Sequence, residues 1–466
     1  MKNLSKLAAI CSVFIFAGCS SDDPDFVEGP TLPPTTVPSV KLQVLHASPD
    51  APAVNVFIDG TETLSAVDYK VGSGLLEVPP ATYNVRVEAI IPGGNADVVD
   101  ADLDLIGGFI YTVAAIGSVA DATFAPLIIQ QQDVPVTAGS ARVFVLHGAE
   151  GAPAVDVYVT EPDIDLAPGI APLGSFAYTE TLGPVEVPAG DYRIRVTGAG
   201  DPDQAVLYDS GSLALVGGDD LTITAVTSTQ AGERTPTNAG PNFSPISLIA
   251  MTGSGSAEIP DVGLPTSANV IHAVPDAGVV DIVLDGAVAA TLDFPEQTGL
   301  LDLPASTYNI SVNSMGTPVI GPVDLPLDGG VEYSILAVGK AMDMTLEPLI
   351  LTDDPRRVAT HSKVRIVHAS PTAMDVDIYV TAVGAGTAGD PTLPGVPFKA
   401  NTGYIPLPAG TYDVTVTPAG MPDVLAIGPA TVTFDALGVY TIIARDPLPG
   451  ATELGVISTQ DSPFGT

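Results

Sequence analysis

The sequence predicts an all-β protein made of four tandem β-sandwich domains. Three observations support this prediction. A stretch that alternates apolar and polar residues, as half-buried strands do, occurs four times along the chain. Proline and glycine are abundant, with 44 and 47 of the 466 residues, and they separate short apolar runs. After the N-terminus, no long segment shows the 3.6-residue period of an amphipathic helix.

The repeated stretch opens with a histidine, and an Asn or Asp follows nine residues later. Its first copy reads HASPDAPAVNVFIDG, and the later copies open with HGAEGAPAVDV, HAVPDAGVVDI and HASPTAMDVDI. The histidines are His46, His147, His272 and His368, and the Asn or Asp residues are Asn55, Asp156, Asp281 and Asp377. Successive histidines lie roughly 95 to 125 residues apart, a length at which each unit can bury its own core. We therefore expect four separately folded domains.

In the first unit, the apolar runs predict seven or eight short strands, the number typical of a β-sandwich. Six of these runs lie at residues 40–45, 54–58, 75–78, 84–87, 111–116 and 126–129. Between the second and third runs, Asp59-Gly60 is a strong signal for a tight hairpin.

A second signature places a tyrosine after a proline turn in every unit. It reads VPPATYNVRV, VPAGDYRIRV, LPASTYNISV and LPAGTYDVTV, and its tyrosines are Tyr83, Tyr192, Tyr308 and Tyr412. A tyrosine in this position can bury its ring while its hydroxyl donates to the loop backbone, as in the tyrosine corner of sandwich proteins. We expect these tyrosines to be structural.

The distance from histidine to tyrosine alternates between short and long units. In units two and four it is longer by eight residues, and the extra residues follow Thr160 and Thr381. Units one and three have the hairpin signals Asp59-Gly60 and Asp285-Gly286 at this place. We expect long loops here in units two and four, and we infer that a two-domain block was duplicated.

The N-terminus has the organisation of a lipoprotein signal peptide, predicted for residues 1–18. Lys2 and Lys6 precede an apolar core at 7–16, which is too short to span a bilayer. The following Phe16-Ala17-Gly18-Cys19 resembles the lipobox of bacterial lipoproteins, which implies lipidation of Cys19, for example with palmitate. In that family Ser20 implies sorting to the outer membrane. Residues 19–39 are polar and Pro-rich, so we expect a flexible tether.

The HASPDAP-like opening and the LPAGTY-like turn together resemble the bacterial domain-of-unknown-function 4397 family. The resemblance covers the four units, placed at residues 40–134, 140–253, 267–354 and 362–461. It implies an exported, often lipidated surface protein, and it supplies no catalytic residues. The LPAGTY-like turn also occurs in prealbumin-like and immunoglobulin-like modules, so we expect sandwiches of this kind.

Few residues are candidates for catalysis or metal binding. Each histidine could bond to the Asn or Asp nine residues on, which would hold its imidazole in one tautomer. No serine, cysteine or third ligand accompanies every copy, so we expect structural histidines that tie the first strand to the next loop, and no enzyme. The carboxylates of Asp97, Asp100, Asp102 and Asp104 are weak calcium candidates, and a solvated strand face is the alternative. No other cofactor is expected.

The formal net charge of −38 argues against nucleic acid as a partner. The favoured hypothesis is a non-catalytic lipoprotein on the cell surface or the periplasmic side, acting as a multidomain spacer, adhesive or protein-interaction array. Its partners would be the membrane, through the lipid, and an extracellular protein or glycan. The alternative is glycan or polysaccharide binding by the long loops of units two and four. Four aromatic residues lie close to those loops, namely Phe176, Tyr178, Phe398 and Tyr404.

Overall fold

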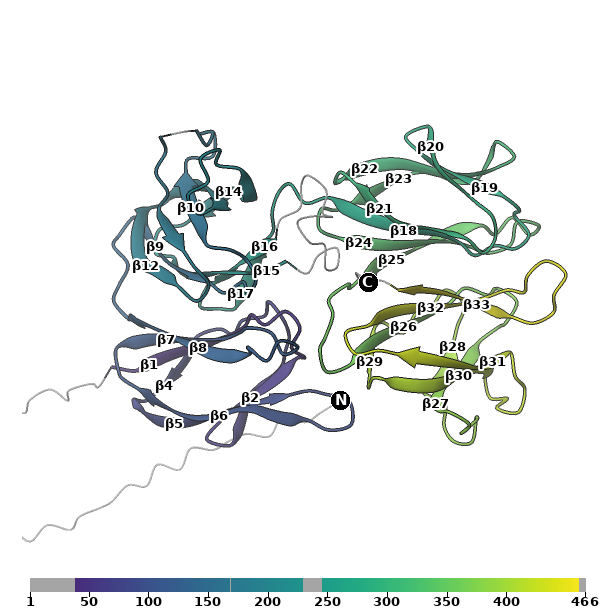
Figure 1. Cartoon of the computed structure of the whole chain (residues 1–466), viewed down its shortest axis with the longest axis horizontal. Coiled ribbons are helices and arrows are strands. Elements are labelled where there is room, and N and C mark those ends of the chain that lie inside the picture. The colour runs from purple at the N-terminus through teal and green to yellow at the C-terminus, as the bar shows by residue number, and fades with distance from the viewer. Residues whose placement is uncertain (1–37, 168, 229–244, 461–466) are drawn as a thin grey trace, which may run out of the picture. The chain divides into compact units, whose positions relative to one another are not determined.

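The first sandwich contains two four-stranded sheets, with strand orders β4-β1-β7-β8 and β3-β2-β5-β6. The computed structural model (Figure 1) describes residues 38–167, 169–228 and 245–460, and every regular element in these ranges is a strand. Its strands are β1 (Val40–His46), β2 (Val54–Ile58), β3 (Thr61–Val67), β4 (Leu76–Val78), β5 (Ala81–Ala89), β6 (Ala96–Leu105), β7 (Phe109–Ile116) and β8 (Ala125–Gln132). We call the sheet with the repeat histidine the histidine sheet and the sheet with the repeat tyrosine the tyrosine sheet.

The second sandwich repeats this plan with one additional strand. Its tyrosine sheet has the order β11-β10-β13-β14 and its histidine sheet the order β12-β9-β15-β16-β17. The strands are β9 (Ser140–His147), β10 (Val155–Thr160), β11 (Gly174–Phe176), β12 (Thr181–Pro188), β13 (Gly190–Gly198), β14 (Val206–Leu215), β15 (Asp220–Thr227), β16 (Ile246–Met251) and β17 (Ser256–Ile259). Strand β17 lies beyond residue 253, where the sequence predicts the end of this domain, because it extends the sheet by pairing with β16.

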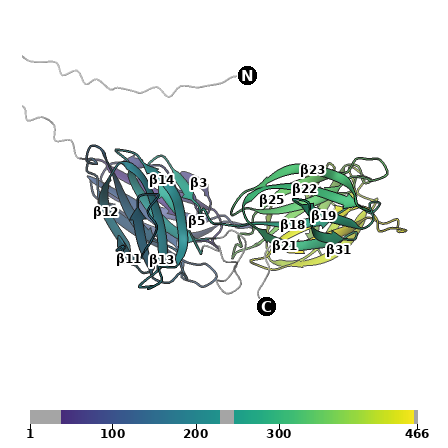
Figure 2. The ribbon, with the colours of Figure 1, turned by 90° about the horizontal axis from the view of Figure 1, so that it is seen from above.

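The third sandwich returns to two four-stranded sheets, β21-β18-β24-β25 and β20-β19-β22-β23, which lie face to face in Figure 1 and are seen from above in Figure 2. Its strands are β18 (Thr266–His272), β19 (Val280–Leu284), β20 (Ala287–Leu292), β21 (Gln297–Leu303), β22 (Ser306–Ser314), β23 (Thr317–Leu327), β24 (Glu332–Val338) and β25 (Glu347–Asp353).

The fourth sandwich has the same topology, with the sheets β29-β26-β32-β33 and β28-β27-β30-β31. Its strands are β26 (Ser362–His368), β27 (Val376–Ala382), β28 (Leu393–Val396), β29 (Ile405–Leu407), β30 (Gly410–Pro418), β31 (Ile427–Phe434), β32 (Val439–Arg445) and β33 (Gly455–Gln460). The all-β sandwich fold predicted from the sequence is thereby confirmed.

Tight hairpins and long loops alternate at the position that the sequence predicts. In the first sandwich, Asp59 and Gly60 have φ angles of 49° and 76° between β2 and β3. Two successive positive φ angles are what a type I′ turn requires, and Asp-Gly adopts them readily. Asp285 and Gly286 repeat this geometry in the third sandwich. In the second and fourth sandwiches, residues 161–167, 169–173 and 383–392 lie in loops instead.

The first sandwich contains two strands that its apolar runs do not indicate. Strand β3 has the sequence TETLSAV and lies at the edge of the tyrosine sheet, with most of its residues exposed. Strand β6 is rich in aspartate and lies at the other edge of the same sheet. Edge strands with polar side chains are common because one side of the strand meets water. Their pairing partners, and not their own hydrophobicity, make them strands.

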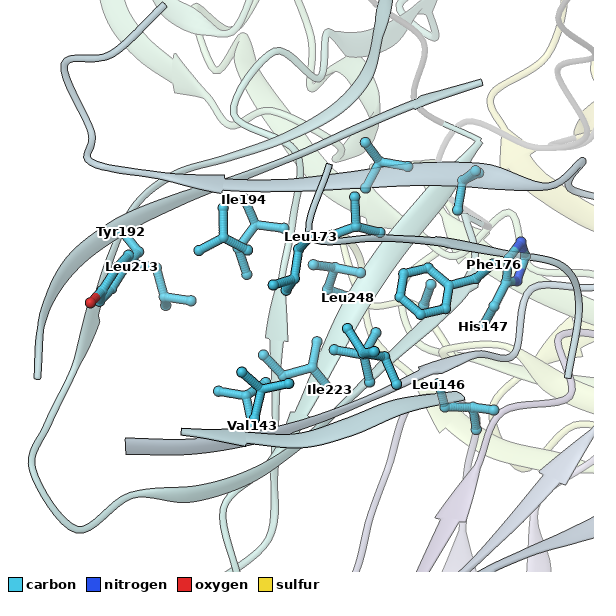
Figure 3. A pocket seen from close by; sticks show the side chains of 18 of the residues that line it. Val143, Leu146, His147, Leu173, Phe176, Tyr192, Ile194, Leu213, Ile223 and Leu248 are labelled. Atoms are coloured by element: carbon cyan, nitrogen blue, oxygen red, sulfur yellow. The ribbon is translucent and has the colours of Figure 1, made fainter. Parts of the chain in front are cut away.

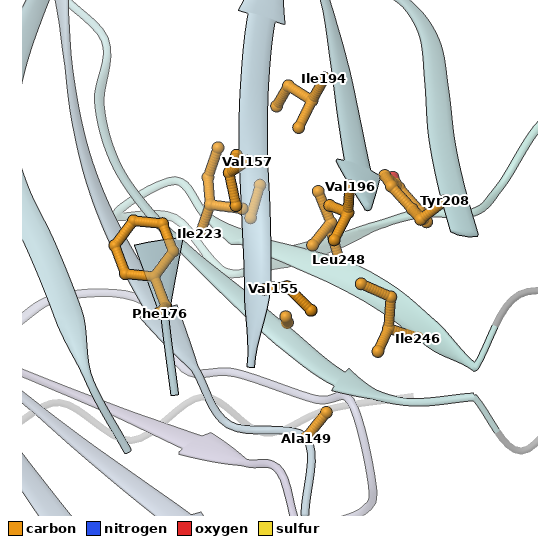
Figure 4. Close-up of a cluster of buried hydrophobic side chains, with 12 residues drawn as sticks. Ala149, Val155, Val157, Phe176, Ile194, Val196, Tyr208, Ile223, Ile246 and Leu248 are labelled. Carbon is orange, nitrogen blue, oxygen red and sulfur yellow. The ribbon is translucent and has the colours of Figure 1, made fainter. Parts of the chain in front are cut away.

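Apolar side chains from both sheets fill the interior of each sandwich. Figure 4 shows this core in the second sandwich, where Val157 on β10 and Ile194 on β13 face Ile223 on β15 and Leu248 on β16. The period-two pattern of the strands directs these residues inward. Burial of one such side chain contributes about 1.5–3 kcal/mol.

The histidine sheets are buried on both faces, because the sandwiches pack in pairs. One apolar cluster joins Leu45, Ala114 and Ile116 of the first sandwich to Leu146 and Met251 of the second.

A second apolar cluster joins Ile271 and Leu336 of the third sandwich to Val367 and Ile443 of the fourth. Each of the four predicted units has an apolar core of its own, and the sandwiches in addition pack in pairs. The outer face of each histidine sheet combines apolar side chains with buried polar ones, such as Gln43 and Arg365, and the neighbouring sandwich covers it.

Candidate functional site

The repeat histidine occupies the same corner in all four sandwiches. Each lies at the end of the first strand of its histidine sheet and is at most 3% exposed. Its Nε2 atom lies within hydrogen-bond distance of a backbone carbonyl six residues on. The distances are 3.0 Å for His46 to Pro52, 3.2 Å for His147 to Pro153, 2.8 Å for His272 to Gly278 and 2.7 Å for His368 to Met374. Because a carbonyl only accepts, Nε2 carries the hydrogen and the imidazole is held in that tautomer.

The hydrogen bonding of Nδ1, the other ring nitrogen, differs between the first two and the last two sandwiches. In His272 and His368, Nδ1 accepts a hydrogen bond of 3.3 Å from the backbone N–H two residues on. In His46 and His147, Nδ1 is buried and has no hydrogen-bond partner. Burial lowers the pKa of His46 and of His272 below the ordinary value, so both imidazoles stay neutral at pH 7.

An aromatic ring packs edge-on against every repeat histidine, at centroid distances of 6.0 to 6.4 Å. These aromatic residues are Tyr69, Tyr178, Phe294 and Phe398. Neither of the two repeat signatures includes them. A signal exists, because a glycine follows each ring after five residues, at Gly74, Gly183, Gly299 and Gly403. The variable loop between histidine and ring obscures this third repeat signature.

The corner belongs to the interface between paired sandwiches. Tyr69 lies in the apolar cluster that joins the first two sandwiches, and its hydroxyl donates to the carbonyl of Thr227 at 2.5 Å. Phe398 packs against the cluster that joins the third and fourth. The guanidinium of Arg445 lies 5.2 Å from the ring centroid of Phe294, within the range of a cation–π contact. The corners thus help to hold two sandwiches together.

The Asn or Asp of each repeat bonds to the edge strand of the tyrosine sheet, and not to the histidine. Asn55 accepts a hydrogen bond from the N–H of Ala66 in β3 at 2.9 Å. Asp377 accepts one from the N–H of Gly395 in β28 at 2.7 Å. The equivalent partners are the hydroxyls of Ser175 for Asp156 and of Thr291 for Asp281. The hydrogen bond that each histidine could have formed with the Asn or Asp nine residues on is not made, since the two residues lie in different sheets.

The repeat tyrosines adopt the geometry of a tyrosine corner. Each hydroxyl donates to the carbonyl of the proline four residues earlier, at 2.8 to 2.9 Å. The pairs are Tyr83 with Pro79, Tyr192 with Pro188, Tyr308 with Pro304 and Tyr412 with Pro408. The bond closes the turn that leads into the tyrosine strand.

The calcium candidates line the exposed surface of β6 without converging. Asp97 forms an ion pair of 2.5 Å with Arg86, and Asp100 accepts a hydrogen bond of 2.8 Å from Asn84. Asn84 also bonds to Asp102, and Thr82 bonds to Asp104. Throughout the described ranges, no three His, Cys, Asp or Glu side chains form a group that could hold a metal ion. These contacts fit a solvated strand face that pairs with polar side chains of β5.

The aromatic residues close to the long loops point into the fold. Phe176 is 4% exposed and belongs to the core of the second sandwich, while Tyr178 and Phe398 pack edge-on against histidines. Tyr404 is half-buried beneath Arg365, whose guanidinium lies 4.7 Å from the ring centroid. Phe176 is thus buried, whereas Tyr178, Phe398 and Tyr404 are half-buried against histidine or arginine side chains.

The N-terminal features lie outside the described residues. They are the signal peptide at 1–18, the lipidation site Cys19 and the tether as far as residue 37. Across the described ranges, no helix is long and apolar enough to cross a membrane.

The chain belongs to the family known as domain of unknown function DUF4397. The family model matches residues 40–158, 266–379 and 362–465, which together cover more than half of the sequence. The first two matches each contain one sandwich and the first two strands of the next. This family is the one that the sequence motifs predict. The comparison with curated proteins gave no match.

Proposed function

We propose that this protein is a non-catalytic lipoprotein of the bacterial outer membrane, anchored by Cys19. Its paired sandwiches would serve as a spacer, adhesive or protein-interaction array on the cell surface or the periplasmic side. One observation carries the proposal. The repeat histidine, the repeat Asn or Asp and the repeat tyrosine each form a hydrogen bond that holds, respectively, a corner, an edge strand and a turn. The repeat therefore reproduces a scaffold, and the same scaffold occurs four times.

The anchor rests on the sequence Phe16-Ala17-Gly18-Cys19. Each buried acyl CH₂ contributes about 0.8 kcal/mol, so several chains on one cysteine anchor a protein firmly. The net charge of −38 supports presentation in a salty medium, where screening beyond about 10 Å limits self-repulsion. Because the loop aromatics are packed inward, we do not extend the proposal to glycan binding.

Metabolic labelling with radioactive palmitate tests the anchor. The wild-type chain should incorporate label, and Cys19→Ala should incorporate none. Cys11→Ala is the matched control, because Cys11 lies within the predicted signal peptide and should be removed with it. Label that persists in Cys19→Ala, or that disappears in Cys11→Ala, contradicts the proposal.

Protease treatment of intact cells tests the location. Digestion of the sandwiches without prior permeabilisation would establish cell-surface presentation, and protection would establish the periplasmic side. Recovery of the labelled protein in the inner-membrane fraction would contradict the outer-membrane part of the proposal.

A further inference from the structure

The second sandwich encloses a cavity of about 190 Å³ between its two sheets (Figure 3). Val143 and Ile223 of the histidine sheet and Ile194 and Leu213 of the tyrosine sheet are among the side chains that line it. Cavities within the first and third sandwiches measure about 80 and 40 Å³. The second sandwich is thus less completely filled than its neighbours.

One repeat position distinguishes the second sandwich from the other three. The strand that pairs in parallel with the histidine strand carries Tyr111, Tyr333 and Tyr440 in the first, third and fourth sandwiches. The second sandwich has Leu221 at the same register, opposite Val143. It therefore lacks one aromatic ring that the other three contain.

The missing ring would lie where the cavity is. In the first sandwich, Tyr111 belongs to an apolar cluster with Leu76, Val78, Leu103 and Leu105. The residues at the equivalent positions of the second sandwich line the cavity, and they are Val185, Val187, Leu213 and Leu215.

The local hydrogen bonds have changed together with the ring. The hydroxyl of Tyr111 accepts a hydrogen bond of 3.1 Å from the N–H of Ile106, five residues earlier. Tyr333 and Tyr440 accept the same bond at 3.3 and 3.2 Å. In the second sandwich, the equivalent N–H of Val216 donates instead to the carboxylate of Asp219 at 2.8 Å. Asp219 thus replaces the hydrogen bond of the missing tyrosine, but no side chain replaces the volume of its ring in the core.

We propose that the second sandwich binds a small apolar molecule, of about the size of benzene or toluene, in this cavity. An apolar cavity of about 150 Å³ stays dry and accepts benzene, because water needs two to four polar partners. Tyr192 and His147 are the only polar side chains among the lining residues, and both already donate to backbone carbonyls. An apolar guest would regain the dispersion contacts that the empty space forfeits.

Access to the cavity lies at the end of the long loop. Leu173 is the last residue of this loop and leads into β11, a strand of three residues. It lines the cavity and is also 43% exposed, so its side chain lies between the cavity and solvent. In the first sandwich, a tight hairpin and the seven-residue strand β3 occupy this edge.

Titration with fluorobenzene, followed by ¹⁹F NMR, tests the proposal on the chain from Ser20 onward, which retains every described residue. We expect one saturable site per chain. Leu221→Tyr restores the repeat tyrosine and should weaken binding by at least about 10-fold, because the ring fills the space. Tyr333→Leu is the reciprocal variant, and it should create a second site in the third sandwich.

Leu221→Phe covers the case in which the tyrosine hydroxyl prevents folding, and far-UV circular dichroism verifies the fold of each variant. Absence of saturable binding by the wild-type chain would overturn the proposal. Unchanged affinity in a folded Leu221→Tyr or Leu221→Phe variant would overturn it as well, since the bound molecule would then lie elsewhere.

Discussion

Replacement of His272 by alanine should destabilise the third sandwich by about 2 to 4 kcal/mol. The imidazole is 1% exposed and makes two hydrogen bonds, to the carbonyl of Gly278 at 2.8 Å and from the N–H of Val274 at 3.3 Å. Each contributes about 1 kcal/mol net. The edge-on contact with Phe294, at a centroid distance of 6.0 Å, adds about 0.5–1.5 kcal/mol. The cavity left by the ring raises the cost further.

The assay combines urea unfolding at pH 7.5 with hydrogen exchange of the peptide that contains β18. Hydrogen exchange locates the loss of stability in a chain with several sandwiches. Val279→Ala is the matched control, because this neighbouring side chain is 52% exposed and its truncation should change the free energy of unfolding by less than about 0.5 kcal/mol.

His272→Gln separates the hydrogen bond from the ring contact. Its amide can donate to the Gly278 carbonyl, so this variant should recover about 1 kcal/mol relative to alanine. The reasoning is refuted if His272→Ala leaves the exchange of β18 as slow as in the Val279→Ala control.

The remaining predictions concern the turn, the pH dependence and the pairing of sandwiches. Tyr308→Phe removes the hydroxyl that donates to Pro304 and should cost about 1 kcal/mol in urea unfolding, whereas a change below about 0.3 kcal/mol would contradict a role for this bond. Burial, with help from nearby positive charges, lowers the pKa of His361 from 6.5 to about 4, so the unfolded chain takes up a proton below pH 6.5 that the folded chain does not. As the pH falls from 6.5 to about 4, this difference in proton uptake should lower the free energy of unfolding by up to about 1.4 kcal/mol per pH unit. His361→Gln should lack this pH dependence in urea titrations. Leu336→Ala should cost about 2–5 kcal/mol and accelerate hydrogen exchange in both the third and the fourth sandwich, while Ile282→Ala, inside the third alone, should act mainly there.

Local signatures were the most predictable part of this protein. The tyrosine corner joins residues four apart, and the histidine bond joins residues six apart, so contiguous sequence contains both partners. The strand at 54–58 is predicted with its observed ends, because an alternating run and an Asp-Gly turn delimit it. The long loops of units two and four follow from the spacing between the two signatures.

Contacts between residues that are separated by a whole strand or a loop of variable length were not predictable in the same way. Asn55 bonds to Ala66 on an edge strand, and the aromatic partner of each histidine follows only after an intervening strand or loop. The strand β3 itself has a polar sequence, and it exists because β2 is available to pair with it. The effect of Leu221 becomes visible only when its register beside Val143 is known.

The sequence by itself determined the family, the four repeats, the sandwich fold and the turns that shape each unit, because these depend on short patterns of apolar, small and turn-forming residues. Only the tertiary structure decided which apolar face is covered by which neighbour. All seven residues of β18 are buried, so both faces of the strand are covered, although Ser267 and Asn269 on the outer face are polar. One face lies against the interior of its own sandwich. The other lies against the fourth sandwich, and a period-two pattern does not distinguish a face buried within one unit from a face buried between two.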